Sequence, residues 1–339
     1  MIVVMKPGAT KEQVQHVVDL VREYGLKDHV ILGTDRAVVA CIGDKRAVDK
    51  GAIENAPMVD RIVPILAPYK MASTEVKKER SQIHIGPEGF PLGGAKVGII
   101  AGPCAVESRE QVLLIADACK AAGCVGLRGG AYKPRTSPYS FQGMAMEGLK
   151  ILAEARARTG LAVVTEVIGL EQIAPCEEYA DVLQIGARNM QHYPLLEAVG
   201  KVKKPVMLKR GMSATLEEFL LAAEYIINAG NPNVILCERG IRTFEDYVRN
   251  TLPLAAVPEL NDKTHLPVVV DPSHGTGHAH LVPAMSRAAV AAGADGLIIE
   301  CHNDPEHAMS DGAQSITPNI LGELMGQLKK IANAVGREM

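Results

Sequence analysis

The stretch VGIIAGPC, residues 97–104, decides the fold once it is compared with seven similar stretches downstream. Each begins with a short apolar run and ends on polar residues, most of them charged or able to bind a metal ion. The seven are CVGLR (124–128), LAVVTE (161–166), VLQIGAR (182–188), PVMLKR (205–210), VILCER (234–239), LPVVVD (266–271) and GLIIE (296–300). Short, β-branched runs of this kind predict strands that are buried on both faces.

Segments with helical periodicity lie between these runs, for example residues 109–122, 144–159 and 216–229. Eight strands that each precede a helix predict a (β/α)8 TIM barrel, an α/β fold in which function gathers at the C-terminal ends of the strands. We therefore expect the eight polar ends to face one another across one mouth.

The N-terminal part of the chain predicts a second, smaller domain. The 339 residues exceed the roughly 250 that one such barrel needs. Strands are expected at 2–5, 30–32, 38–42 and 59–65, and helices at 11–24 and 45–55, with Thr10 and Glu12 starting the first helix and Gly25 ending it. The order β-α-β-β-α-β is that of a ferredoxin-like α+β domain.

A charged stretch at residues 73–80 without apolar periodicity reads as a connection between the two domains. The predicted division is a ferredoxin-like domain at 1–70, a linker at 71–84 and the barrel at 85–339. Residues 83–96 are rich in glycine and proline, and they predict a hairpin that closes the bottom of the barrel.

Composition and charge narrow the class of protein. The net charge of −3 and the lack of a basic tail give no reason to expect a nucleic-acid partner. The apolar runs are too short to span a membrane, and the opening MIVVMKPGA does not resemble a signal peptide. Seven cysteines without disulfide-like spacing fit a reducing compartment, so a cytoplasmic protein is expected.

Four metal-binding residue types follow the predicted strands: Cys104 after the first, His274 after the seventh, Glu300 at the end of the eighth and Asp311 beyond it. A thiolate, an imidazole and two carboxylates suit Mn²⁺, Fe²⁺, Co²⁺ or Zn²⁺. Each residue alone also has an ordinary explanation, such as a buried apolar role for Cys104. The rival histidine ligands are His278, His280, His302 and His307.

Basic residues also gather at the predicted strand ends, which suits a phosphate or carboxylate ligand. They are Arg128, Lys133, Arg135, Arg188, Lys209, Arg210 and Arg239. For each, pairing with Glu166, Glu238 or Asp271 on an adjacent strand is an equally good explanation. The turn at residues 133–137, KPRTS, is more informative because two cations and two hydroxyls there have no packing role.

The motifs together resemble one enzyme family. They are AGPC (101–104), KPRTSPYSFQG (133–143), IGAR (185–188), LKRG (208–211), CERG (237–240) and DPSHGTG (271–277), with Arg128 five residues before the second. In order and spacing the chain resembles the 3-deoxy-D-arabino-heptulosonate 7-phosphate (DAHP) synthases, in the short form with an N-terminal ferredoxin-like, ACT-like regulatory domain. The resemblance covers residues 85–330 of the barrel and residues 1–70 before it.

The resemblance implies condensation of phosphoenolpyruvate with D-erythrose 4-phosphate, the first step of the shikimate pathway, with release of phosphate. It implies a divalent metal, Mn²⁺ before Fe²⁺, Co²⁺ or Zn²⁺, held by Cys104, His274, Glu300 and Asp311. The residues that it assigns to phosphoenolpyruvate are Arg128, Lys133, Arg188, Lys209 and Arg239. Those that it assigns to the phosphate of erythrose 4-phosphate are Arg135, Thr136 and Ser137.

Three residues are candidates for chemistry beyond binding. Glu166 is expected to organise the attacking water, and Asp271 belongs to the same catalytic set. Lys133 could protonate the new alkoxide, a role for which we expect its pKa to be lowered by neighbouring cations.

The resemblance also implies feedback inhibition by tyrosine or phenylalanine through the N-terminal domain, with His29 as a candidate contact, and a homotetramer. Two alternatives remain. One is 3-deoxy-D-manno-octulosonate 8-phosphate synthase, whose KANR-type loop is replaced here by Lys133-Pro134-Arg135-Thr136. The other is a sensor of phosphate or amino acids without catalytic activity.

Overall fold

The structure is a computed structural model that describes residues 1–33, 35–43, 48–63, 68–134, 137 and 139–339. Within these residues the chain divides into two compact units, Met1–Glu79 and Arg80–Met339. The division falls in the charged stretch 73–80, while the domain boundaries at residues 70 and 84 stay predictions.

The first unit is an antiparallel sheet with two helices, so the predicted ferredoxin-like fold is confirmed. Its elements are β1 (Ile2–Met5), α1 (Lys11–Glu23), β2 (Lys27–Leu32), β3 (Ala37–Ile42), α2 (Lys50–Glu54) and β4 (Val59–Val63), in the strand order β2-β3-β1-β4. Helix α1 starts at the expected Thr10, which forms a capping box with Gln13. Helix α2 starts at Lys50 because Asp49 caps it, accepting hydrogen bonds from the backbone of Gly51 and Ala52, while residues 45–47 of the predicted helix lie outside the described residues.

Strand β1 shows how this sheet buries two faces. Val3 and Met5 pack in one apolar cluster with helix α1, whereas Ile2 and Val4 pack with Val76 on the other face. The alternation follows from the two-residue period of a strand.

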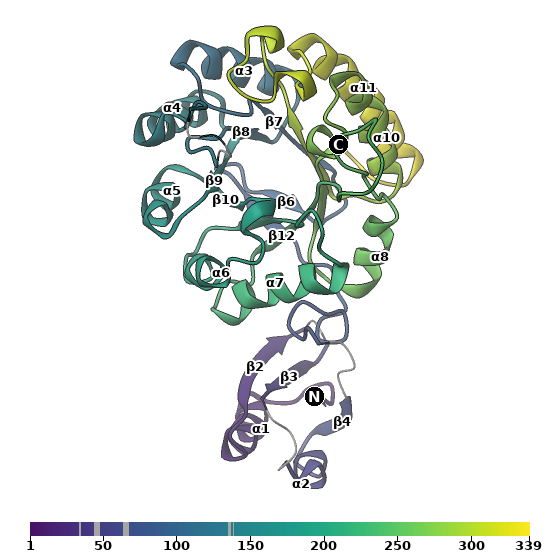
Figure 1. The fold of residues 1–339 in the computed structure, drawn as a ribbon. Coiled ribbons are helices and arrows are strands. Elements are labelled where there is room, and N and C mark those ends of the chain that lie inside the picture. The colour runs from purple at the N-terminus through teal and green to yellow at the C-terminus, as the bar shows by residue number, and fades with distance from the viewer. Residues whose placement is uncertain (34, 44–47, 64–67, 135–136, 138) are drawn as a thin grey trace. The chain divides into compact units, whose positions relative to one another are not determined.

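The second unit contains a closed barrel of eight parallel strands, as predicted. The strands are β7 (Gly98–Gly102), β8 (Gly126–Arg128), β9 (Ala162–Val167), β10 (Val182–Ile185), β11 (Val206–Lys209), β12 (Val234–Glu238), β13 (Val268–Val270) and β14 (Gly296–Glu300). Around them lie α3 (Arg109–Ala122), α4 (Ala145–Thr159), α5 (Ile173–Tyr179), α6 (Tyr193–Val199), α7 (Leu216–Asn228), α8 (Ala256–Lys263), α9 (Pro272–Thr276), α10 (Val282–Ala291) and α11 (Pro318–Ala334). Figure 1 shows the ring of strands surrounded by helices.

A hairpin of β5 (Ile83–Ile85) and β6 (Phe90–Leu92) closes one end of the barrel, as expected for residues 83–96. Its residues Ile83, Ile85 and Leu92 pack in one cluster with side chains from inside the barrel. A Cβ added to Gly98, the first residue of β7, would lie 2.8 Å from the Leu92 side chain. The hairpin therefore sits at the N-terminal ends of the strands and leaves the C-terminal ends open for a site.

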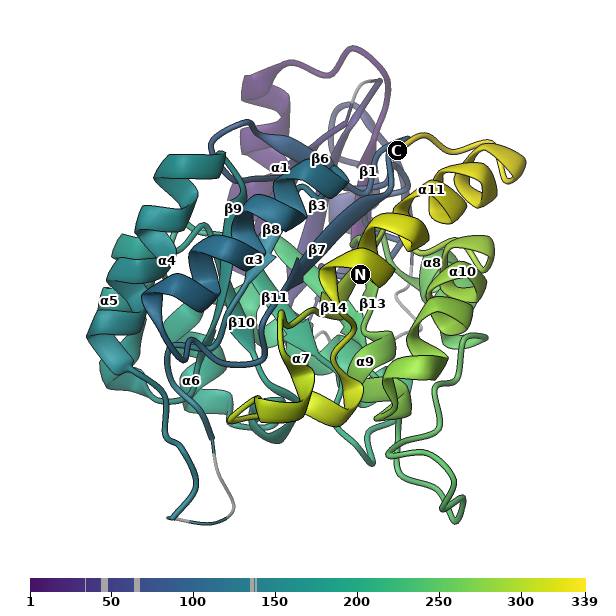
Figure 2. The ribbon, with the colours of Figure 1, turned by 90° about the horizontal axis from the view of Figure 1, so that it is seen from above.

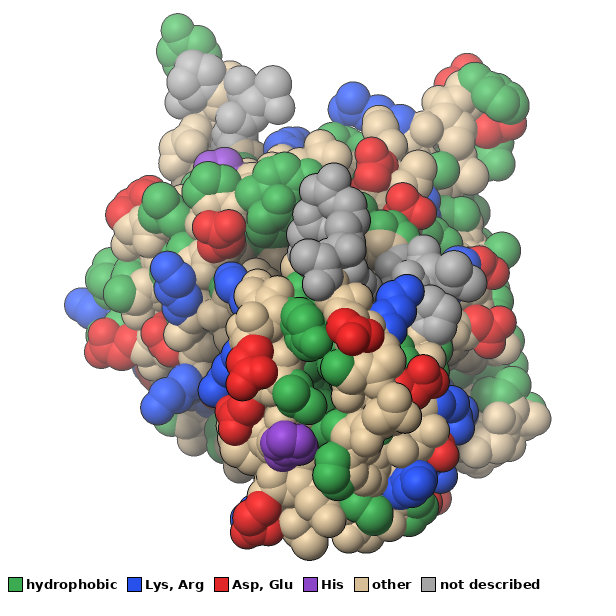
Figure 3. Space-filling view, turned by 90° about the horizontal axis from the view of Figure 1, so that it is seen from below, with side chains coloured by type: hydrophobic (Ala, Val, Ile, Leu, Met, Phe, Trp, Pro, Cys, Tyr) green, Lys and Arg blue, Asp and Glu red, His purple; other side chains and the backbone are tan. Residues whose placement is uncertain are grey.

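The loop after β12 extends beyond the C-terminal ends of the strands, in green at the bottom of Figure 2. On the face seen in Figure 3, acidic and basic side chains are interspersed with apolar ones. Among the described residues, no helix has the length and apolar content needed to cross a bilayer.

Candidate active site

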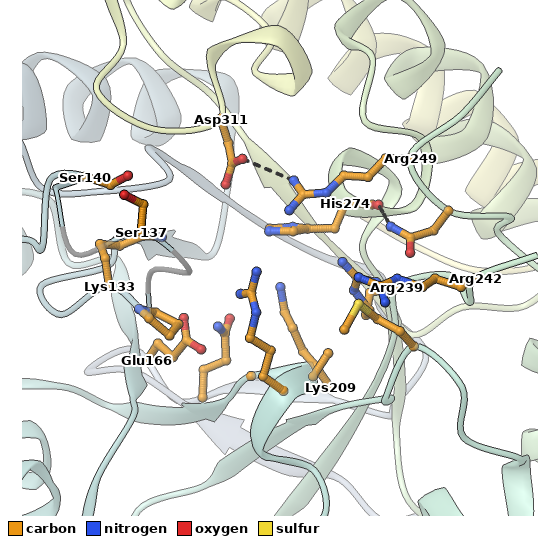
Figure 4. Close-up of a pocket in the computed structure, with 17 residues that line it drawn as sticks. Lys133, Ser137, Ser140, Glu166, Lys209, Arg239, Arg242, Arg249, His274 and Asp311 are labelled. Carbon is orange, nitrogen blue, oxygen red and sulfur yellow. Dashed lines mark hydrogen bonds and ion pairs between the residues drawn. The ribbon is translucent and has the colours of Figure 1, made fainter. Parts of the chain in front are cut away.

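A cavity of about 370 Å³ lies at the C-terminal ends of the barrel strands (Figure 4). Strand ends and loops from most of the barrel contribute to it. Its lining is Lys133, Pro134, Ser137, Ser140, Glu166, Gln184, Gly186, Ala187, Arg188, Lys209, Met212, Arg239, Arg242, Arg249, Asn250, His274 and Asp311. The cavity brings together distant segments that the sequence motifs had singled out one by one.

Three of the four predicted metal ligands form one group next to this cavity. One ligand atom from each of Cys104, Glu300 and Asp311 lies within 4.8 Å of the other two. The Cys104 thiol donates to Asp311 Oδ2 at 3.1 Å, and the fourth predicted ligand, His274, has Nε2 at 3.6 Å from Glu300 Oε1. All four side chains therefore meet at one corner of the barrel mouth.

The rival histidines have other partners. His302 Nε2 lies 2.8 Å from Gln111 Nε2 and 3.3 Å from Glu107 Oε2, and its Nδ1 accepts from the backbone of Asp304. His307 pairs with Asp304, and the rings of His278 and His280 face each other at 5.7 Å. None of these four belongs to the Cys104–Glu300–Asp311 group among the residues that the structure describes.

Asp271 orients His274. Asp271 Oδ1 accepts the backbone N–H of His274 as the N-cap of α9, and Oδ2 lies 2.7 Å from His274 Nδ1. Burial disfavours the carboxylate, but the neighbouring His274 and Lys209 outweigh burial and hold the pKa of Asp271 well below its usual value. Burial lowers the pKa of His274, so its neutral form can donate from Nδ1 and keep Nε2 free for a metal ion.

The Cys104 thiol is buried in a polar setting. Lys133 Nζ lies 3.0 Å from both its Sγ and its carbonyl oxygen, and Ser310 Oγ lies 3.0 Å from Sγ. Burial, and after it the charge of Glu300, raise the pKa of the thiol to about 12, although Lys133 opposes the shift. A metal ion bound here has to displace the thiol proton, as is general for thiolate ligands.

The donor set fits a divalent cation. Glu300 is fully buried, and Arg128 Nη1 lies 3.2 Å from its Oε1 as an ion pair. That approach lacks hydrogen-bond geometry, so neither Arg128 Nη1 nor Glu300 Oε1 has a hydrogen-bond partner among the described residues. A buried carboxylate oxygen without a partner is costly, and a cation between Oε1, Cys104 and Asp311 would satisfy it.

The predicted anion-binding residues within the described part of the chain differ in where they lie. Lys133, Arg188, Lys209 and Arg239 line the cavity, whereas Arg128 lies beside it against Glu300. Arg210 instead pairs with the buried Glu238 at 2.6 Å, so the structural explanation holds for that residue. Lys209 pairs with Asp271 at 2.5 Å while still lining the cavity.

The expected lowering of the Lys133 pKa is wrong. Burial does act to lower it, but the neighbouring Cys104 and Glu166 side chains outweigh burial, and the pKa of Lys133 is raised. Burial lowers the pKa of Arg239, which the nearby Asp271 only partly offsets, so an anionic ligand beside Arg239 would stabilise its charge.

Glu166 reaches the cavity because residue 186 is glycine. A Cβ at Gly186, in the IGAR motif, would lie 2.0 Å from Glu166 Oε1. Figure 4 shows Glu166 and Lys133 on the same side of the cavity. Gly102 in the AGPC motif is needed for a similar reason, because it has a φ of 153° and an added Cβ would lie 2.2 Å from the Arg128 carbonyl oxygen.

Of the predicted phosphate-binding turn, Ser137 lines the cavity, whereas Arg135 and Thr136 lie outside the described residues. Sequence reasoning missed Arg242, Arg249, Asn250 and Gln184. The sequence did contain an indication for Gln184, because it is a polar residue inside the apolar run VLQI. It contained none for Arg249 and Asn250, because they lie in an irregular loop more than ten residues past the end of β12.

Comparison with known proteins agrees with these motifs. The sequence model of the DAHP synthetase I family matches residues 76–336, and that of the DAHP synthase ferredoxin-like domain matches residues 1–67. The chain belongs to the DAHP synthase family. The resemblance inferred from the motifs is thereby confirmed, and the chain is an enzyme, a transferase of the DAHP synthase type.

Relatives support this membership over the whole chain. A phospho-2-dehydro-3-deoxyheptonate aldolase of Thermotoga maritima is 49% identical over 336 residues and covers 99% of each chain. The crystal structure of the DAHP synthase of Thermotoga maritima matches with a TM-score of 0.79 over 99% of this chain and 98% of that one. A 2-dehydro-3-deoxyphosphooctonate aldolase of Koribacter versatilis is 34% identical and covers only 72% of this chain but 94% of its own.

Proposed function

We propose that this DAHP synthase condenses phosphoenolpyruvate with D-erythrose 4-phosphate and water, giving 3-deoxy-D-arabino-heptulosonate 7-phosphate and phosphate, with the help of a divalent metal. One observation carries the proposal. The Cys104–Glu300–Asp311 group and His274 meet at the same cavity as Lys133, Arg188, Lys209 and Arg239. A metal corner beside a cationic wall suits an aldehyde and an anionic co-substrate.

A divalent ion held by Cys104, His274, Glu300 and Asp311 would act as a Lewis acid toward the aldehyde oxygen, with Mn²⁺ our first choice and Fe²⁺, Co²⁺ or Zn²⁺ the others. Arg128, Lys133, Arg188, Lys209 and Arg239 would bind the carboxylate and phosphate of phosphoenolpyruvate. Arg135, Thr136 and Ser137 would bind the phosphate of the aldehyde substrate.

The protein's own groups would then handle protons. The raised pKa of Lys133 keeps a proton on Nζ, which it can donate to the alkoxide that forms when C3 of phosphoenolpyruvate attacks the aldehyde carbon. Glu166, on the same side of the cavity as Lys133, would orient the water that adds at C2. Asp271 would act as a positioning residue through its 2.7 Å contact with His274.

The test is phosphate release from phosphoenolpyruvate by metal-stripped protein, with and without added Mn²⁺, with erythrose 4-phosphate and arabinose 5-phosphate offered in parallel. We expect metal-dependent turnover with the four-carbon sugar. A preference for arabinose 5-phosphate would instead favour the octulosonate synthase, an alternative raised by the 34% identity to a 2-dehydro-3-deoxyphosphooctonate aldolase. Silence with both sugars would contradict the proposal.

We further propose that tyrosine or phenylalanine inhibits the enzyme through the N-terminal unit. A cavity of about 820 Å³ in that unit has an apolar floor from the sheet and a charged rim. The floor includes Val4, Ile31, Val38 and Val63, and the rim includes Arg36, Arg61, Glu75 and Glu79. An apolar floor suits an aromatic ring, and a rim of both signs suits an amino acid's ammonium and carboxylate. His29 lies in β2 and is not among the described residues that line this cavity.

Deletion of residues 1–70 tests this regulation. Turnover should persist while inhibition by tyrosine and phenylalanine disappears, since an effector must bind one state better than the other to inhibit. Inhibition that survives the deletion would rule out the N-terminal unit as its origin. The homotetramer and the cytoplasmic location are also proposals, and the seven cysteines without disulfide-like spacing support a reducing compartment.

A further inference from the structure

Arg249 contacts one of the four proposed metal ligands directly and is linked to a second through Gln314. Its Nη1 donates to Asp311 Oδ1 at 3.1 Å and to Gln314 Oε1 at 2.7 Å. Gln314, which is buried, donates in turn from Nε2 to Glu300 Oε2 at 2.6 Å. Arg249 thus touches one ligand directly and a second through one intervening amide, and Figure 4 shows its guanidinium reaching Asp311.

These contacts occupy only the outer oxygens of the two carboxylates. Asp311 Oδ2 faces the Cys104 thiol at 3.1 Å, and Glu300 Oε1 has no hydrogen-bond partner among the described residues. The inner oxygens Oδ2 and Oε1 are therefore left to face the metal corner, while Oδ1 and Oε2 are held from behind. Hydrogen bonds of this kind orient metal ligands and tune their affinity in many metalloproteins.

Asp311 needs such support because its backbone is strained. It has a φ of 53° and a ψ of 32°, in the left-handed region, which is uncommon for any residue with a side chain, although aspartate adopts it more often than most. Strain of this kind persists only where surrounding contacts hold the residue in place. The Arg249 and Cys104 contacts on the two carboxylate oxygens supply that restraint.

Arg249 is itself fixed by the DPSHGTG motif. Its backbone N–H donates to the Thr276 carbonyl at 2.8 Å, and a Cβ on Gly277 would lie 2.4 Å from Arg249 Cβ. The neighbouring Asn250 donates from Nδ2 to the His274 carbonyl at 2.8 Å. Residues 249–250, from the loop after β12, therefore brace three of the four proposed ligands without being ligands themselves.

We infer that Arg249 is a positioning residue for the metal centre, acting on Asp311 directly and on Glu300 through Gln314. The inference rests on the proposed metal-dependent function. It assigns a metal-orienting role to a cation that would otherwise be counted with the anion-binding wall. The two roles predict opposite changes in metal affinity when Arg249 is replaced. Removing a cation of the anion-binding wall should strengthen metal binding, whereas removing a residue that positions the ligands should weaken it.

The experiment measures Mn²⁺ affinity by calorimetric titration of the metal-stripped, full-length protein, so that it does not depend on turnover. Arg249→Met should weaken Mn²⁺ binding about 10- to 100-fold. Arg242→Met is the matched control, since Arg242 lines the same cavity and the change removes the same charge. Its Mn²⁺ affinity should be unchanged or higher.

Gln314→Leu tests the relay. It should weaken Mn²⁺ binding on its own, and the double variant with Arg249→Met should lose less than the product of the two single effects, because both act on Glu300. Thermal unfolding in chelator checks that each variant folds. This is expected for Arg249→Met because the Arg249 side chain is 38% exposed.

Two outcomes separate the possible failures. Wild-type-like Mn²⁺ affinity in Arg249→Met, or single effects that multiply in the double variant, overturns the inference and leaves the proposed function intact. A wild-type protein that neither binds a divalent ion nor turns over overturns the proposed function itself.

Discussion

The two ends of the barrel are built from the same eight strands but satisfy opposite requirements. At the N-terminal end the hairpin residues Ile83, Ile85 and Leu92 fill the interior with apolar contacts. At the C-terminal end the buried groups are charged, and Glu300 Oε1 and Arg128 Nε lack hydrogen-bond partners among the described residues. The N-terminal end contributes stability through apolar packing. The C-terminal end is less stable because it keeps buried polar atoms unsatisfied, and a bound cation and bound anions can satisfy them.

The largest effect should come from removing the metal or its thiolate ligand. Chelation, or Cys104→Ala, should reduce phosphate release about 10³-fold, since a Lewis acid supplies several kcal/mol of transition-state stabilisation. Mn²⁺ should restore the chelated wild type but not the variant. Full turnover in Cys104→Ala would remove this residue from the metal site.

A change at the opposite end should alter stability and leave the chemistry alone. Leu92→Ala deletes a fully buried side chain from the hairpin and should lower the free energy of unfolding by about 2–5 kcal/mol. Denaturant unfolding measures the loss, and kcat at a temperature where the variant is folded should match wild type. A large fall in kcat there would show that the two ends are coupled.

An intermediate effect is expected at Asp271. Asp271→Asn should weaken Mn²⁺ binding about 10- to 100-fold, because the imidazole of His274 loses the carboxylate at its Nδ1. The variant also leaves Lys209 without its anionic partner, which lowers stability. Lys209→Met is the control: it should raise KM for phosphoenolpyruvate and change Mn²⁺ affinity little. If both variants lost metal equally, the orienting role of Asp271 would be wrong.

The smallest effect concerns the water-organising role of Glu166. Gly186→Ala should lower kcat about tenfold by pushing the Glu166 carboxylate aside; an ångström of misplacement can cost up to about 100-fold. The φ of −68° at Gly186 suits alanine, so the backbone is not strained. Glu166→Gln should lower kcat with Mn²⁺ affinity retained, and unchanged turnover in that variant would refute the assignment.

Much of the fold followed from local patterns. The eight apolar runs became the barrel strands, because burial on both faces makes such strands recognisable without knowing their neighbours. Of the helix expected at 45–55, residues 45–47 lie outside the described residues, and the helix α2 that the structure describes starts at Lys50 because Asp49 caps it. The sequence also predicted which residues could bind a metal ion, namely Cys104, His274, Glu300 and Asp311. Each follows or ends a predicted strand, and the C-terminal ends of the strands in a TIM barrel lie at one face.

The sequence by itself determined the barrel, the ferredoxin-like unit, the enzyme family and the side chains that could bind a metal ion and anions. Only the tertiary structure decided which charges pair with one another and which face the cavity. In the structure Arg210 forms an ion pair with Glu238, and His302 contacts Gln111. Arg249 forms a hydrogen bond with Asp311, which is 62 positions away in the chain. Periodicity reports which residues are buried, whereas pairing between loops depends on distances that only the folded backbone creates.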